Sequence, residues 1–160
     1  MAEITTLEEK LAEVTGLARA AKDATEEVEG LLDGDELAQT LRQMRQEAEE
    51  TEQRCSELID QREGKKTAIL EKAQETKKEA TEMMSTYLGE DADGLDGFEF
   101  LTMAEAGEAG HWAVLGKLSE KAGEGEIDDL VQWALPIQER HLSEVKEGSL
   151  KLAEKEDPNG

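Results

Sequence analysis

The chain has 160 residues, of which 37% are hydrophobic, 3% are aromatic and two are proline. This size allows one compact domain, and the composition excludes a mostly β fold and favours long helices packed through small side chains. The formal net charge of −22 argues against binding to nucleic acids or to anionic membrane surfaces, because both depend on clustered Lys and Arg.

The N-terminus carries no signal for export, since no basic region precedes an apolar run, and no stretch of 18 apolar residues follows anywhere. We therefore expect a soluble, cytoplasmic protein. Cys55 is the only cysteine, so it has no partner for an internal disulfide. It falls on an apolar helical position, where we predict a buried thiol.

The first half of the chain shows helical spacing. Apolar or small residues recur in steps of three and four over 4–32 and again over 37–58, which predicts two amphipathic helices. "DGDE" (33–36) separates them and offers Asp35 as an N-cap. The segment 65–88 keeps helical spacing with little apolar bulk, and it is either a separate helix or a continuation of the second.

The second half begins with "GEDADGLDG" (89–97), which we predict to be a loop. Its "DADG" is similar to the start of a calcium loop, but the closing carboxylate is missing, which argues against calcium. Two further helices are predicted over 98–122 and 127–154, and residues 156–160 form a flexible tail. The expected fold is all-α, an antiparallel up-and-down bundle of four to five long helices in one domain, 1–155.

The stretch "AEAGEAGHW" (104–112) breaks the apolar pattern of its helix, because Glu105 and Glu108 occupy positions that should face the core. Burying an ionised carboxylate alone costs roughly several kcal/mol, so each must be protonated, paired with a cation or bound to a metal. Gly107 and Gly110 lower the helix propensity here, by about 1 kcal/mol each, and predict close approach of another helix.

Further candidate ligands surround these two glutamates. His111 lies one turn beyond Glu108, and the last helix has a matching polar interruption at Gln138 and His141. The second helix adds acids beside its apolar stripe, whereas Glu8 and Glu13 of the first helix face solvent by their phase. The candidate metal ligands are therefore Glu105, Glu108, His111, His141, Gln138, Glu139, Glu47 and Glu50. Carboxylates and imidazoles that converge in a bundle core are typical of non-haem iron or manganese sites.

A metal-free interpretation explains the same residues. Glu105 and Glu108 would then pair with Lys or Arg at a sheltered interface, and the protein would be a structural or interaction bundle that forms a homo-oligomer. A hydrolytic enzyme has little support, since no nucleophile motif or phosphate-binding loop accompanies the acids.

At the level of pattern, the chain from about residue 34 to the end resembles the YciF-like branch of the ferritin-like superfamily, bacterial helical proteins associated with stress. "DELAQTLRQMRQEAEETEQRCSELI" is similar to the second bundle helix of that family, "LTMAEAGEAGHWAVLGKLSEKAG" to the third, and "LVQWALPIQERHLSEVKEGSLKLA" to the last.

This resemblance implies a ferritin-like bundle in which Glu105 and Glu108 bind iron or manganese, with Gln138 and His141 at a Glu-x-x-His-like position. It also implies a role in oxidative or general stress, with activation of oxygen or peroxide if the protein is an enzyme. The chain departs from the pattern at Gln138, which is neutral, at Glu47, where histidine is frequent, and in the first helix, where no counterpart of the family glutamate occurs. These departures predict weaker binding, or one metal ion rather than two.

Overall fold

The computed structural model describes residues 3–160 and places five α-helices in them. They are α1 (Thr6–Glu29), α2 (Ala38–Asp60), α3 (Lys66–Tyr87), α4 (Gly94–Ala122) and α5 (Gly125–Glu154). This part of the chain contains no strand, which confirms the predicted all-α class. None of the helices described is both long enough and apolar enough to cross a membrane.

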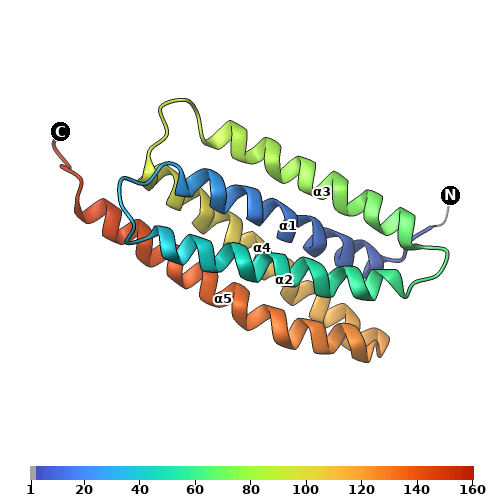
Figure 1. Ribbon diagram of the computed structural model, residues 1–160. Helices are drawn as coiled ribbons and strands as arrows, with labels where there is room; N and C mark the ends of the chain where they lie inside the picture. The colour runs from blue at the N-terminus through green and yellow to red at the C-terminus, as the bar shows by residue number, and fades with distance from the viewer. Residues whose placement is uncertain (1–2) are drawn as a thin grey trace.

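The helices form a four-helix bundle with a fifth helix on its outside. α1 packs against α2 and α4, α5 packs against the other sides of α2 and α4, and α3 packs mainly on α1. Consecutive helices run in opposite directions, so α1 and α3 point the same way. These two helices also pack side by side (Figure 1). The antiparallel bundle is confirmed, and segment 65–88 is a separate helix rather than an extension of α2.

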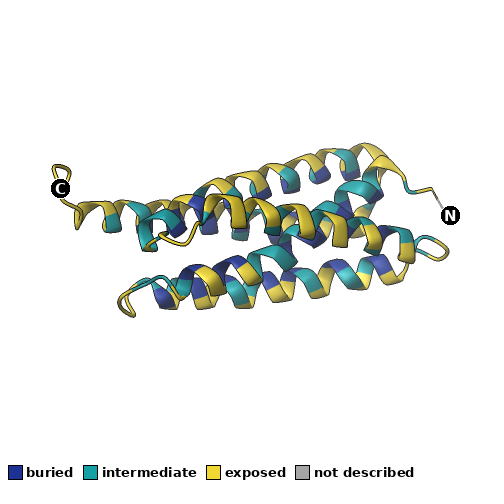
Figure 2. Ribbon diagram, turned by 90° about the horizontal axis from the view of Figure 1, so that it is seen from above, coloured by how far each residue is buried: buried dark blue, intermediate teal, exposed yellow. Residues whose placement is uncertain are grey.

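Buried hydrophobic residues occur on all five helices, and Figure 2 marks the buried residues in dark blue along the ribbons. They form two apolar clusters, one near each end of the bundle. The first contains Cys55, Trp112 and Leu115, and the second contains Met44, Phe98 and Val145. Buried polar side chains of α4 and α5 lie between these clusters and form the candidate site.

Helix boundaries follow local capping. At the start of α1 the Thr5 hydroxyl accepts a hydrogen bond from the Glu8 backbone N–H. At the start of α4 the Asp93 carboxylate accepts one from the Asp96 backbone N–H. α4 therefore starts at Gly94, inside the predicted loop 89–97. The prediction that Asp35 caps the second helix is wrong, because the N-cap of α2 is Leu37 and it makes no side-chain cap.

Close helix contacts occur at other glycines than those predicted. A Cβ at Gly16 would lie 2.3 Å from the Ala73 carbonyl oxygen of α3, whereas a Cβ at Gly107 or Gly110 would meet no atom within 4 Å. The expectation of close approach at Gly107 and Gly110 is wrong, because both glycines lie on the exposed face of α4.

Candidate functional site

A polar layer crosses the bundle between the two apolar clusters. It contains Glu105 and Glu108 of α4 and Gln138 and His141 of α5, each no more than 4% exposed. Glu47 of α2 reaches the layer from a half-buried position. Each pair on one helix is three residues apart, so both members lie on the inward face.

His141 lies between carboxylates from two other helices. Its Nε2 donates a hydrogen bond of 2.9 Å to Glu47 Oε1, and its Nδ1 lies 3.8 Å from Glu105 Oε2. The second oxygen of Glu47 accepts a hydrogen bond from the guanidinium of Arg140. His141 thus connects α2, α4 and α5 through its two ring nitrogens.

The surroundings of His141 favour a charged ring. Burial acts to lower the pKa of His141, but hydrogen bonding and charge from Glu105 and Glu47 outweigh it and raise the pKa above its usual value of 6.5. The shift favours the protonated form of His141, whose ring lies between the carboxyl groups of Glu47 and Glu105.

The surroundings of Glu108 favour its neutral form, in contrast to those of His141, which favour a charged ring. Burial and, after it, the nearby negative charge of Glu105 raise the pKa of Glu108 well above 4.5. The shift of this pKa favours the neutral carboxylic acid form of Glu108 over its carboxylate form. Buried carboxyl groups with perturbed pKa values occur often in functional sites, which makes Glu108 a candidate site residue.

Two oxygen atoms of the layer have no hydrogen-bond donor among residues 3–160, namely Glu105 Oε2 and Gln138 Oε1. Buried acceptors without donors are rare, and each costs roughly 1–3 kcal/mol. A carboxylate oxygen and an amide oxygen are also hard donors of the kind that bind divalent cations. The layer therefore has unused capacity for a positive charge.

Three of the predicted ligands lie outside the layer. The side chain of His111 is 45% exposed, and its ring contacts the Gly107 carbonyl and Glu13 rather than Glu108. The inward place one turn beyond Glu108 belongs to Trp112, which is fully buried. Glu50 and Glu139 are exposed, and Glu50 pairs with Arg54 of its own helix. The structure thus brings together Glu47, Glu105, Glu108, Gln138 and His141 from the predicted set.

Some partners could not be identified from the sequence. Arg140 reaches Glu47 because it precedes His141 on the edge of the same helix face, and no local pattern indicates this contact between helices. Glu8, which was expected to face solvent, is buried instead and contacts Arg62 and Lys65, both at 3.1 Å. These two residues follow α2 in the chain, so this expectation failed because of a contact between distant segments.

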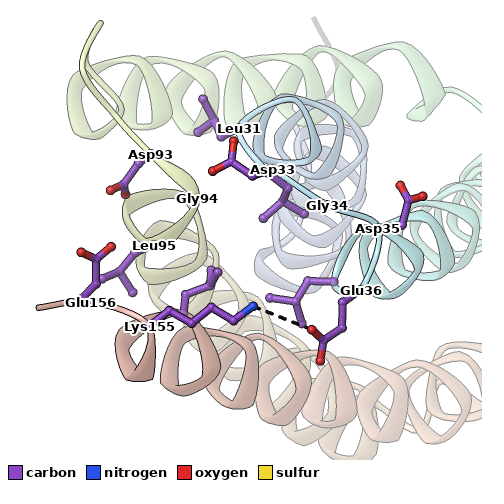
Figure 3. Close-up of a pocket in the computed structure, with 13 residues that line it drawn as sticks. Leu31, Asp33, Gly34, Asp35, Glu36, Asp93, Gly94, Leu95, Lys155 and Glu156 are labelled. Carbon is purple, nitrogen blue, oxygen red and sulfur yellow. Dashed lines mark ion pairs between the residues drawn. The ribbon is translucent and has the colours of Figure 1, made fainter.

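A pocket lies where the connection between α1 and α2, the start of α4 and the end of α5 meet (Figure 3). Acidic side chains from three segments surround a cavity of about 360 Å³, but Asp35 points away from the others and Glu36 turns towards Lys155 at 3.8 Å. Asp93, within "DADG", serves as the N-cap of α4.

Across residues 3–160, no three His, Cys, Asp or Glu side chains are already grouped closely enough to hold a metal ion. The polar layer is thus a hydrogen-bonded ion-pair arrangement in this conformation. The fold and the layer together define the class of this protein as an all-α helical bundle with a buried carboxylate–imidazole layer. The chain matches no protein-family model, and a comparison with curated proteins found no match.

Proposed function

We propose that the polar layer binds one divalent transition-metal ion, iron or manganese, in a ferritin-like bundle that acts in oxidative or general stress. The observation that carries this proposal is the presence of two buried oxygens without hydrogen-bond donors, Gln138 Oε1 and Glu105 Oε2, the latter 3.8 Å from Nδ1 of the buried His141 ring. Glu105, Glu108 and His141 would hold the ion, with Gln138 as a neutral oxygen donor.

The residues of the polar layer would fit a metal ion after Glu108 and His141 lose a proton each. Glu108 would lose its proton, and His141 would turn from Glu47 and present a neutral nitrogen. Glu47 would keep a cationic partner, because Arg140 also binds it. When bound, iron or manganese would supply Lewis-acid and redox chemistry. The chain itself would exclude bulk water, since the apolar clusters cover both sides of the layer.

A single ion is proposed because α1 offers no carboxylate at this level. The buried residues in the middle of α1 are Thr15, Gly16 and Ala18. Glu8, the one buried acid of α1, lies about nine residues before Leu17, roughly 14 Å along the helix, and is already paired. Sites for two ions use a carboxylate from each of the four helices.

The metal proposal is tested by metal content. Untagged protein, as isolated and after anaerobic loading with ferrous iron, is analysed by inductively coupled plasma mass spectrometry. We expect near-stoichiometric metal in the wild type, and loss of it in Glu105→Gln and His141→Gln. The matched controls are Glu139→Gln and His111→Gln, which alter exposed residues of the same types and should retain the metal.

A metal-free structural role is the second candidate function, and the existing contacts of the His141 ring favour it. Both ring nitrogens already face carboxylates, so the layer is able to fix the register of α2, α4 and α5 without an ion. Under this candidate the protein associates with itself in the cytoplasm. Wild-type protein that stays free of metal after loading, while His141→Gln changes stability or oligomeric state, would replace the metal proposal with this one.

A further inference from the structure

An open hollow lies between the second half of α3 and the first half of α4, outside the polar layer. It is lined by Glu79, Glu82, Met83, Thr86, Tyr87 and Met103. Met83, Tyr87 and Met103 are 59%, 46% and 48% exposed, and they account for three of the five large hydrophobic side chains exposed in residues 3–160. Single exposed hydrophobic residues are ordinary, but several gathered in one place mark an interaction site.

The hollow follows from the way three helices pack. α3 and α4 both pack on α1 but make few contacts with each other, which leaves a groove between them. Ala80, Met84 and Ala104, each next in sequence to a residue of the hollow, line a deeper and partly open part of this groove. A groove with a helix on each side and a third beneath has the shape that receives a further helix.

The side chains of the hollow suit a protein surface better than a small molecule. The hollow is wide open to solvent, whereas sites for small molecules enclose most of the ligand. Methionine side chains are flexible and adapt to the shape of a partner. Tyr87, whose ring centroid lies 5.6 Å from that of Phe100, adds an aromatic group of the kind that anchors protein interfaces. A helix laid along the groove would cover all of these side chains at once.

The charges around the hollow decide which kind of helix fits. Glu79 and Glu82 are exposed at its edge, and no Lys or Arg lines it. Glu26 and Glu27 of α1 border the next hollow along α3, together with Met84. A second copy of this chain would bring the same excess of negative charge, which is −22 per chain. A helix that carries Lys or Arg beside its apolar stripe has the complementary charge.

We propose that the hollow between α3 and α4 binds a basic amphipathic helix of a partner protein. The apolar stripe of that helix covers Met83, Tyr87 and Met103. Its Lys or Arg side chains lie against Glu79 and Glu82. The inference is independent of the proposed function, because none of these residues belongs to the polar layer, and it is tested in metal-free protein.

The probe is a synthetic Leu–Lys peptide of several helical turns, whose leucines recur in steps of three and four. Metal-free protein with isotope-labelled methionine methyl groups is titrated with it and followed by NMR. We expect saturable shifts of the Met83 and Met103 methyl signals and none of the Met44 signal, because Met44 is 1% exposed in the second apolar cluster. A Leu–Glu peptide with the same spacing, and a Leu–Lys peptide with scrambled order, should leave all three signals unchanged.

The apolar contacts are tested by the affinity of the labelled Leu–Lys peptide, measured by fluorescence anisotropy. Met83→Gln combined with Met103→Gln should weaken binding at least about tenfold, because two apolar side chains no longer leave water on binding. Leu150→Gln is the control, since Leu150 is 62% exposed and lies outside the hollow, and it should bind as wild type. Circular dichroism checks each fold, and the single methionine variants replace the double variant if that one is unfolded.

The charges are tested by two variants of equal net charge. Glu79→Gln with Glu82→Gln should weaken binding about threefold at low ionic strength. Glu49→Gln with Glu57→Gln, at exposed positions of α2, should bind as wild type, and equal losses in the two would show binding through net charge alone.

That result would overturn the inference, as would unchanged affinity of the folded methionine variants or a peptide that shifts neither Met83 nor Met103. Methyl shifts of these two residues that follow protein concentration without any peptide would also overturn it, because a second copy of the chain then occupies the hollow. Failure of the metal proposal appears separately, as absence of metal from wild-type protein after loading, whatever the peptide does.

Discussion

Replacing Glu108 by Gln tests the electrostatics of the polar layer most directly. The pKa of Glu108 is raised in the folded protein, so the folded state holds this proton more tightly than the unfolded state. The stability gained from this tighter binding of the proton is complete below pH 4.5 and is lost as the pH rises through the folded-state pKa of Glu108. Glu108→Gln removes the titration while nearly conserving the shape of the side chain.

The expected size of the effect follows from burial. Glu108 is 4% exposed and lies beside Glu105, so ionising it adds a second buried negative charge. Each unit by which the pKa is raised is equivalent to about 1.4 kcal/mol, and a buried group without a partner costs roughly 1–3 kcal/mol. We expect Glu108→Gln to raise the free energy of unfolding by about 1–3 kcal/mol at about pH 9 and to change it little at about pH 5.

The assay is urea denaturation followed by far-UV circular dichroism, with a chelator present throughout. A parallel thermal scan should show a rise of roughly 2–4 °C for each kcal/mol. Glu99→Gln, an exposed position on the same helix, is the control and should show no such pH dependence. An equal effect of Glu108→Gln at both pH values, or destabilisation at about pH 9, would refute the raised pKa of Glu108.

Three further outcomes are expected in the same denaturation assay or beside it. His141→Gln should cost about 3–5 kcal/mol, since it leaves buried carboxylates without their cation. Because the pKa of His141 is raised, this loss of stability is full below pH 6.5 and shrinks as the pH rises through the folded-state pKa. The control variant His111→Gln should change stability by less than about 0.5 kcal/mol. Gly16→Ala should cost about 1–3 kcal/mol through the clash with α3, and Gly107→Ala, in open space, should gain about 1 kcal/mol; equal effects of the two would contradict the packing described. Burial raises the pKa of the Cys55 thiol to about 12, so a thiol reagent should label it only after denaturant is added, and rapid labelling of native protein would show that the first apolar cluster is open.

The bundle itself was predictable because spacing in steps of three and four decides which face of a helix is buried. The same spacing identified Glu105, Glu108, Gln138 and His141 as inward-facing, and the structure places all four in one layer. Phase along a single helix is sufficient for that conclusion, since it does not depend on the neighbouring helices.

Contacts between helices were harder to predict. His111 is three residues from Glu108, but Trp112 is four residues away and larger, and it takes the inward position. Glu8 appeared exposed by phase, yet the loop after α2 brings Arg62 and Lys65 to it. Both cases depend on which element packs alongside, and that information is spread over distant parts of the chain.

The position of the polar layer has a consequence for the order of folding. The chain divides into two sets of helices, α1 to α3 and α4 with α5, and the helices contact members of their own set more than those of the other set. Glu47 comes from the first set, whereas the other four residues of the layer come from the second. Local contacts form faster than distant ones, so we expect each set to collapse before the two dock. The layer then becomes dry only at docking, and its acids and histidine stay hydrated until the final step of folding.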